Sequence, residues 1–294
     1  MSLSLRATPA TDSARRPWRP SALIRASVVL HVGAAAFALA RPHWWPWALG
    51  AVMADHLLLT AAGLTPRSRL LGPNWTRLPQ PSSAAPAIAI TIDDGPDPQV
   101  TPRVLDVLDA HRARATFFCV GERVLQHAGL AREIVSRHHE IGNHSYRHLK
   151  RFSLLGPRGV AEEVLRAQQA IGATTGVSAR FFRAPAGLRN PFLEPVLAHA
   201  NLQLVSWTRR GFDTVNANAT GVLARLTRGL SAGDILLLHD GHAARSRAGT
   251  PVILEVLPRL LAALGAAGIT PVTLGRALEG TGVPAAACAQ SVPS

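Results

Sequence analysis

The feature that most constrains this chain is a series of short apolar runs, each ending in acidic, imidazole or guanidinium side chains. Residues 87–92 form the clearest run, Ala-Ile-Ala-Ile-Thr-Ile, which is rich in β-branched side chains and typical of a buried parallel strand. Asp93 and Asp94 follow it directly, and Gly95-Pro96 then forces a turn. In α/β folds the carboxyl ends of parallel strands are where catalytic groups gather. The pattern predicts an α/β fold with two adjacent carboxylates at its functional edge.

Two histidines and one of these carboxylates provide the donor set of a metal site. His144 and His148 are four residues apart, so one helical turn would place both imidazoles on the same face. With Asp94 they offer two nitrogens and one oxygen and leave an open position for water, which is typical of catalytic rather than structural zinc. Adjacent carboxylates repel each other unless a metal or a proton separates their roles. We therefore expect one acid to bind metal and its neighbour to take protons.

Three further side chains follow strand-like apolar runs later in the chain, namely Arg183, Asp213 and His239. Each has an ordinary structural alternative: an arginine paired with a structural carboxylate, a turn residue and a core histidine. The carboxylate pair could likewise be a solvated turn, and the histidine spacing could arise by chance among 12 histidines. The ordered series favours one shared site, because a single barrel end would collect all of these residues.

The ordered motifs resemble those of the polysaccharide deacetylases, the NodB-homology domain of carbohydrate esterase family 4. The resemblance runs from about Pro86 to Leu278 and rests on five segments: Thr91–Asp97, His144–His148, Arg183–Gly187, Trp207–Asp213 and Leu236–His239. Residues 115–118 are similar to the family's second strand, and residues 272–274 to its closing strand. The resemblance implies a distorted, incomplete (β/α) barrel.

The resemblance also implies a role for each residue of the predicted metal site. Asp93 would be the general base, while Asp94, His144 and His148 would bind a divalent metal, usually Zn²⁺, with Co²⁺ or Ni²⁺ as alternatives. A metal-bound water would then attack the amide carbonyl of an N-acetylated sugar as Asp93 removes its proton.

The remaining roles concern the leaving group and the developing negative charge. By resemblance, His239 is the general acid that protonates the leaving amine, Asp213 orients its ring, and Arg183 holds the general base. The backbone N–H of Ala186 would complete the oxyanion site.

Two departures from the family pattern affect the substrate rather than the reaction. The third motif has Ala186 where the family usually has an aromatic residue, and the fourth has Asp213-Thr214 where the family usually has Asp-Trp. With one tyrosine in the whole chain, little surface is expected for sugar stacking. The expected substrate is an N-acetylated polysaccharide, oligosaccharide or lipid-linked glycan. Alternatives are a deformylase or deacetylase of a lipid-linked amino sugar at the inner membrane face, and a membrane-anchored sugar-binding scaffold without catalysis.

The N-terminal part contains two apolar stretches of nearly membrane-spanning length, Ala22–Ala40 and Trp45–Leu64. The tryptophans around residues 41–44, between the two stretches, suit a membrane interface, so the sequence predicts a hydrophobic helical hairpin. Four ionisable residues would be costly in hydrocarbon: Arg25, His31, Asp55 and His56. Two buried helices of a soluble domain, or a signal peptide cleaved after residues 38–40, are the alternatives.

Arginines flank the predicted hairpin and indicate its orientation. A cluster of three precedes it and a cluster of three follows it, whereas its loop has only Arg41; the clusters are Arg15, Arg16 and Arg19, and Arg67, Arg69 and Arg77. The positive-inside rule then favours a bacterial inner membrane with the catalytic domain on the cytoplasmic side. A cleaved signal or a single span would instead expose it to the periplasm.

Composition limits the partners and the domain organisation. The net charge of +13 suits nucleic acid or an anionic surface, but no nucleic-acid motif occurs, so we expect membrane lipid and a sugar substrate as partners and no protein partner. Cys119, predicted to be a core residue, and Cys288 suggest no disulfide framework. The predicted organisation is a basic flexible segment (1–20), two hydrophobic, membrane-associated helices (21–64), a linker (65–85), the catalytic domain (86–280) and a disordered tail (281–294).

Overall fold

The computed structural model describes residues 16–79 and 85–279. The predicted tail at 281–294, Cys288 and the first 15 residues of the predicted flexible segment lie outside these ranges. The predicted domain boundaries stay a prediction.

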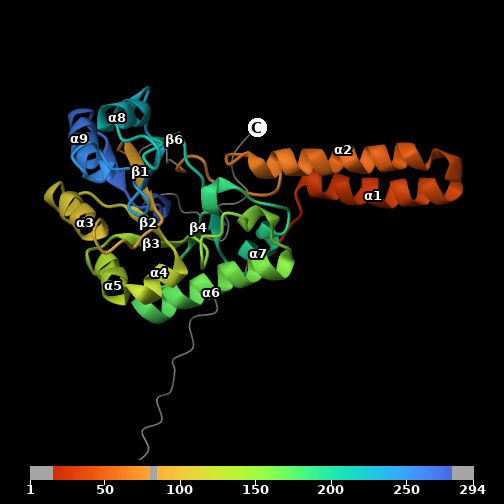
Figure 1. Cartoon of the computed structure of the whole chain (residues 1–294), viewed down its shortest axis with the longest axis horizontal. Coiled ribbons are helices and arrows are strands. Elements are labelled where there is room, and N and C mark those ends of the chain that lie inside the picture. The colour runs from red at the N-terminus through yellow and green to blue at the C-terminus, as the bar shows by residue number, and fades with distance from the viewer. Residues whose placement is uncertain (1–15, 80–84, 280–294) are drawn as a thin grey trace, which may run out of the picture.

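An eight-stranded sheet forms the centre of the protein and curls into an incomplete barrel, as the sequence predicts (Figure 1). Its strands pair in the order β5-β4-β3-β2-β1-β7-β6, and β8 pairs with the first half of β1. Every pairing between them is parallel. The strands are β1 (Ala87–Asp93), β2 (Thr116–Cys119), β3 (Glu140–Asn143), β4 (Phe181–Phe182), β5 (Gln203–Leu204), β6 (Arg209–Arg210), β7 (Ile235–His239) and β8 (Thr270–Val272).

Helices surround the sheet, and most of them lie in the connections between its parallel strands (Figure 1). The α-helices after β1 are α3 (Thr101–Ala110), α4 (Gly121–Gln126), α5 (Ala128–Ser136), α6 (Pro157–Thr175), α7 (Leu193–His199), α8 (Ala219–Thr227), α9 (Val252–Ala266) and α10 (Arg276–Glu279). Two short 3₁₀ turns follow β3 and β4, η2 (Phe152–Leu154) and η3 (Pro185–Gly187).

Strand β1 is buried on both faces, which explains its unbroken apolar sequence. Ile88, Ile90 and Ile92 pack in the outer core, which includes residues of α3 and α9. Ala89 faces the smaller core inside the barrel with Phe118. Because β1 pairs with both β2 and β7, the residues at its carboxyl end lie at the middle of the functional edge.

A connecting segment, residues 65–79, joins the N-terminal helices to the barrel and packs against it. Trp75 bridges to Val205, just after β5, and Arg77 bridges to Asp234, just before β7. Trp75 is buried in the inner core of the barrel. The connecting segment therefore fills the opening between the two sides of the incomplete barrel.

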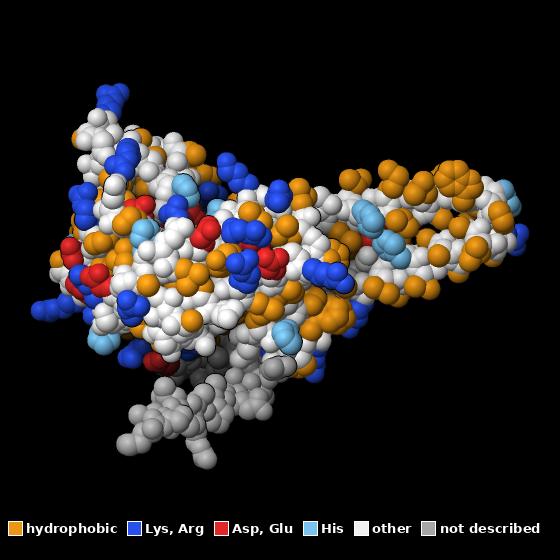
Figure 2. Space-filling model, turned by 60° about the horizontal axis from the view of Figure 1, so that its bottom comes forward, with side chains coloured by type: hydrophobic (Ala, Val, Ile, Leu, Met, Phe, Trp, Pro, Cys, Tyr) orange, Lys and Arg blue, Asp and Glu red, His pale blue; other side chains and the backbone are white. Residues whose placement is uncertain are grey.

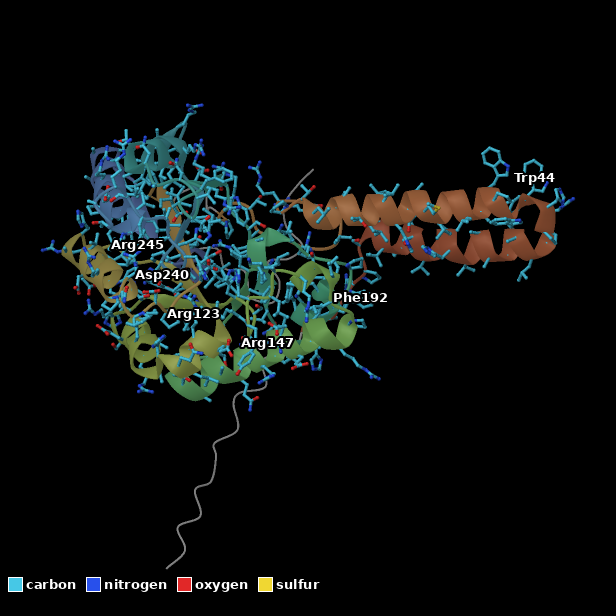
Figure 3. The ribbon with its side chains drawn as sticks, in the orientation of Figure 1. Trp44, Arg123, Arg147, Phe192, Asp240 and Arg245 are labelled. Atoms are coloured by element: carbon cyan, nitrogen blue, oxygen red, sulfur yellow. The ribbon has the colours of Figure 1, made fainter. Side chains whose placement is uncertain are left out.

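The N-terminal helices form the expected hairpin, which projects away from the barrel (Figure 1). It consists of α1 (Ala22–Ala40), the 3₁₀ turn η1 (Pro42–Trp44) and α2 (Trp45–Leu64). Both helices are long and apolar enough to cross a membrane. Hydrophobic side chains cover most of the visible face of the hairpin, and Trp44 lies at the end farthest from the barrel (Figures 2 and 3).

Candidate active site

Asp93 and Arg183 form a buried ion pair at the carboxyl end of β1. Arg183 directly follows β4, and its Nη1 lies 2.6 Å from Oδ1 of Asp93. Three further hydrogen bonds fix the guanidinium: to the hydroxyl of Thr91 and to the backbone carbonyls of Val205 and Ser206. This network occupies Oδ1 of Asp93. The other oxygen, Oδ2, faces the neighbouring His144 and lies 3.8 Å from its Nε2.

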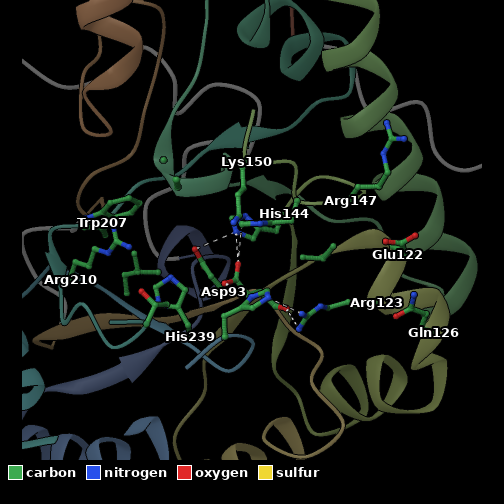
Figure 4. A pocket seen from close by; sticks show the side chains of 18 residues that line it. Asp93, Glu122, Arg123, Gln126, His144, Arg147, Lys150, Trp207, Arg210 and His239 are labelled. Atoms are coloured by element: carbon green, nitrogen blue, oxygen red, sulfur yellow. Dashed lines mark hydrogen bonds and ion pairs between the residues drawn. The ribbon is translucent and has the colours of Figure 1, made fainter. Parts of the chain in front are cut away.

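The three predicted metal ligands converge at one point beside this pair (Figure 4). The Nε2 atoms of His144 and His148 each lie 3.2 Å from Oδ1 of Asp94. Nδ1 of His144 is 2.8 Å from the backbone carbonyl of Arg183, which fixes the tautomer that leaves Nε2 free for a metal. Two imidazole nitrogens and one carboxylate oxygen suit Zn²⁺ or a similar divalent ion.

The expectation that a helical turn aligns the two histidines is wrong. Residues 144–148 form a loop in which Ser145 and His148 have φ values of 63° and 52°. The side chain of Asn143 accepts a hydrogen bond from the Ser145 N–H, and the hydroxyl of Ser145 accepts one from the His148 N–H. These local side-chain bonds compete with helix formation and turn both rings toward Asp94.

His239 and Asp213 form a second buried pair near the predicted metal ligands. His239 is the last residue of β7 and lies directly opposite Asp93 in the sheet register. Asp213 accepts a hydrogen bond from the backbone N–H of His239 over 2.7 Å, and its other oxygen lies 2.9 Å from Nδ1 of the ring. The ring is thus oriented with Nε2 free, as a proton donor to a bound substrate requires.

The pKa values of the histidines in the site are shifted in different directions. Burial lowers the pKa of His239, but the Asp213 carboxylate outweighs it and the net pKa is raised. Burial and the nearby His144 lower the pKa of His148 to about 4, so this ring is neutral near pH 7. Burial also lowers the pKa of His144, but the carboxylates of Asp93 and Asp94 raise it overall.

The carboxyl group of Asp94 is held in its charged form. Burial raises its pKa, but hydrogen bonds with His144 and His242 and the charge of His144 and His148 bring it well below the usual range. A charged carboxylate beside a neutral imidazole is the protonation state that metal binding requires.

A cavity of about 510 Å³ opens over these groups, and most of the predicted residues line it (Figure 4). The lining residues include Asp93, Asp94, His144, His148, Ala186 and His239. Arg183 and Asp213 lie behind the lining, where Arg183 holds the Asp93 carboxylate and Asp213 holds the His239 ring. Ala186 has a φ of 54° within η3, so its backbone belongs to a tight turn at the cavity wall.

Sequence reasoning missed two residues that hold Asp94. Nδ1 of His242 lies 3.3 Å from Oδ2 of Asp94, and Arg123 donates a hydrogen bond to the Asp94 backbone carbonyl over 3.0 Å. Arg123 also contacts Nε2 of His242 over 3.3 Å. Neither residue ends an apolar run. The only signal available was the position of His242 three residues after His239.

Asp240 follows His239 directly at the end of the same apolar run, but the sequence assigned it no role. It is buried, which raises its pKa to about 7, and it accepts hydrogen bonds from Thr101 and from the Gly241 N–H. Its carboxylate lies against Gly95, where a β-carbon would collide with it. Asp240 thus packs against the turn that follows the two catalytic-edge carboxylates.

The mouth of the cavity is basic and poor in aromatic residues. Its cationic lining residues are Arg123, Arg147, Lys150 and Arg210, and Trp207 is its aromatic lining residue. Arg147 pairs with Glu163 over 2.7 Å. Across residues 16–79 and 85–279, Lys150 and Arg210 form no ion pair with a carboxylate. Thr214 lines the cavity where the family pattern has tryptophan.

Comparison with known proteins assigns this arrangement to a family. The family model described as polysaccharide deacetylase matches residues 81–205. A chitooligosaccharide deacetylase of Sinorhizobium fredii is 35% identical over 193 residues, which cover 64% of this chain and 89% of that protein. The chain belongs to the polysaccharide deacetylase family. This confirms the resemblance seen in the sequence and identifies the protein as a hydrolase.

Two further proteins, one of them a solved structure, are similar to this chain. A peptidoglycan-N-acetylglucosamine deacetylase of Bacillus cereus is 34% identical over 175 residues, which cover 59% of this chain and 81% of that protein. The solved structure of a family 4 carbohydrate esterase from Streptomyces lividans, in complex with acetate, is 31% identical. It superposes with a TM-score of 0.58 over 64% of this chain and 93% of the esterase, which confirms the incomplete barrel.

Proposed function

We propose that this polysaccharide deacetylase removes the acetyl group from an N-acetylated amino sugar with the help of a divalent metal. The observation that carries the proposal is the convergence of His144 and His148 on one oxygen of Asp94, beside Asp93 and opposite His239. The named relatives act on chitooligosaccharide or on peptidoglycan N-acetylglucosamine, which supports an N-acetylated sugar as substrate.

Asp94, His144 and His148 would hold the metal, which supplies Lewis acidity toward the amide carbonyl and toward water. Asp93 takes the proton of the attacking water through Oδ2, because Arg183 occupies Oδ1. The fixed position of this carboxylate keeps its free oxygen within reach of the reacting atoms.

His239 provides the proton for the other half of the reaction. Its Nδ1 is engaged by Asp213, so Nε2 is the atom that donates to the leaving nitrogen. Its raised pKa keeps the ring protonated further toward neutral pH than an ordinary histidine. The backbone N–H of Ala186, at the cavity wall, would stabilise the negative oxygen.

A lipid-linked amino sugar, carrying an acetyl or a formyl group, is the second candidate substrate. Pro66, in the connecting segment just after α2, lies against Gly187, the neighbour of Ala186. The base of the hairpin therefore adjoins the cavity. Lys150 and Arg210, which form no ion pair with a carboxylate in the described part of the chain, would suit a phosphate between sugar and lipid, whereas a cavity with little aromatic surface suits a long polymer poorly.

We also propose that the hairpin lies in a bacterial inner membrane. The exposed apolar side chains of α1 and α2 support membrane insertion. The flanking arginines favour a cytoplasmic active site, with the periplasmic side as the alternative. Labelling single cysteines introduced at residues 41 and 66 with a membrane-impermeant maleimide, in intact cells and in lysed cells, would determine the side.

The decisive experiment measures deacetylation by the purified full chain loaded with Zn²⁺. Three substrates are compared: a chitooligosaccharide, a peptidoglycan fragment and a lipid-linked N-acetylated or N-formylated amino sugar. The His144→Ala variant is the matched control. Acetate release that this variant lacks supports the proposal, and absence of release of either acyl group from all three substrates contradicts it. Preference for the lipid-linked compound selects the second candidate.

A further inference from the structure

A second group of metal-ligand side chains lies within the hairpin, outside the catalytic cavity. His31 of α1 and Asp55 and His56 of α2 place one ligand atom each within 4.8 Å of one another. Ionisable groups are costly among apolar helices and commonly mark a functional site there. Figure 2 shows two histidine side chains next to each other about midway along the hairpin. The deacetylase reaction gives this group no role.

Hydrogen bonds in the hairpin orient these side chains. Nδ1 of His31 lies 2.8 Å from the backbone carbonyl of Ser27, which can only accept, so the ring proton is on Nδ1. Nε2 of His31 then carries the lone pair and faces Nε2 of His56 over 3.1 Å. The hydroxyl of Ser27 donates to Oδ2 of Asp55 over 2.6 Å, so a single residue positions both a histidine and the carboxylate.

The donor types and the anchoring of one histidine are the same as in the predicted catalytic metal site. Each group has two imidazoles and one carboxylate, and in each a histidine Nδ1 lies 2.8 Å from a backbone carbonyl: His31 at Ser27 and His144 at Arg183. The ring centroids are 5.1 Å apart in the hairpin and 4.8 Å apart in the cavity. Two nitrogens that share a tetrahedral Zn²⁺ at about 2.0–2.1 Å lie about 3.3 Å apart. The separation of the facing Nε2 atoms fits such sharing.

We propose that His31, Asp55 and His56 form a second site for a divalent transition metal, with Zn²⁺ as the expected ion. Imidazole and carboxylate donors together favour Zn²⁺ over Mg²⁺ or Ca²⁺. Because the ligands come from both helices, a bound ion joins α1 to α2. Asp55 is buried and His56 is exposed, so the site opens to the surface of the hairpin and leaves a further coordination position accessible.

Metal content of the full chain tests this site independently of the deacetylase activity. The protein is purified in detergent without a polyhistidine tag, loaded with Zn²⁺, freed of loose metal and measured by elemental mass spectrometry. We expect two Zn²⁺ per wild-type chain, one in His144→Ala and one in the double variant His31→Ala/His56→Ala. The triple variant should bind none. The matched control is His43→Ala, in the turn of the hairpin, which should keep two.

Milder variants separate metal binding from folding of the hairpin. Asp55→Asn removes a charged ligand but retains an oxygen that accepts the Ser27 hydrogen bond. Ser27→Ala removes that bond and should weaken Zn²⁺ binding at this site about 10- to 100-fold. Circular dichroism should show unchanged helix content in both variants, and Co²⁺ absorption in a His144→Ala background should report the hairpin site alone.

One Zn²⁺ per wild-type chain that is lost in His144→Ala would overturn the proposal. Two Zn²⁺ retained in the double variant would overturn it equally.

Discussion

The guanidinium of Arg183 lies 2.6 Å from the carboxylate of Asp93, and both side chains are enclosed by the barrel. The hydrogen bonds of Arg183 to the Val205 and Ser206 carbonyls tie this pair to the segment that follows β5. Each charge of a buried pair depends on its partner, because neither can be solvated by water. The position of the proposed base is thus fixed by residues from the far side of the sheet.

Arg183→Met should destabilise the protein by about 3–5 kcal/mol, because it leaves the Asp93 carboxylate buried without its partner. Chemical unfolding followed by near-ultraviolet circular dichroism measures this loss. Adding Asp93→Asn to the same chain should recover part of the stability, since the uncompensated charge disappears. A double variant no more stable than Arg183→Met would show that the remaining hydrogen bonds of Arg183, rather than the ion pair, dominate.

Asp93→Asn should lower kcat by about 10²- to 10⁴-fold, because the amide cannot accept the proton of the attacking water. Metal content should stay at the wild-type level, since Asp93 is not among the proposed ligands. Activity and metal are measured on the same preparation. Wild-type turnover in this variant would remove Asp93 from the role of general base.

Asp213→Asn should move the alkaline limb of the kcat/KM profile to lower pH. In the wild type the raised pKa of His239 keeps the acid protonated until pH rises through that pKa, and activity then falls. Without the Asp213 carboxylate, burial lowers the pKa of His239 against only the smaller effects of Asp93 and Asp94, so the acid is lost at a lower pH. The pH profile of metal-loaded enzyme provides the test. An unshifted limb would mean that another group donates the proton.

Chelation should abolish activity, and added Zn²⁺ should restore it in the wild type but not in His148→Ala. His242→Ala offers a matched comparison, because this histidine also contacts Asp94 but lies outside the proposed ligand set. It should retain the metal, with affinity reduced about 10- to 100-fold as for an orienting partner. Equal loss of metal in both variants would make His242 a ligand.

A chain that begins at residue 65 should be more stable than one that begins at residue 79. The longer chain retains Trp75, which is buried and accepts a hydrogen bond from the Ser206 N–H over 2.7 Å. Trp75→Ala in the longer chain should cost about 3–5 kcal/mol, as is usual for a buried tryptophan. Thermal unfolding of the three proteins provides the comparison. Equal melting temperatures would show that the connecting segment contributes nothing to the barrel.

The sequence predicted the features that depend on a short stretch of neighbouring residues. The apolar run of β1 marks a strand buried on both faces, and the reactive residues follow such runs because parallel strands end at a common edge. The order of the motifs therefore sufficed to bring Asp93, Arg183 and His239 into one pocket.

Features set by individual side chains could not be predicted in this way. The loop at residues 144–148 depends on hydrogen bonds from Asn143 and Ser145, which override the helical spacing of the histidines. Trp75 and Arg77 lie in a segment without periodicity, so nothing local indicates that this segment bridges two parts of the barrel. Arg123 reaches the site because α4 begins beside the turn that follows β1, where the Val120 N–H donates to the Gly95 carbonyl.

The connecting segment has a consequence for how substrates are encountered. It pairs with the barrel opening through Trp75 and Arg77, and its Pro66 lies against Gly187 in the wall of the cavity, so the hairpin is not a loose tether. With the hairpin in a bilayer, as proposed, the cavity is held at a fixed height and tilt above the lipid surface. Encounter then depends on lateral diffusion in two dimensions, and molecules that travel within the same leaflet are sampled more often than those arriving from solution.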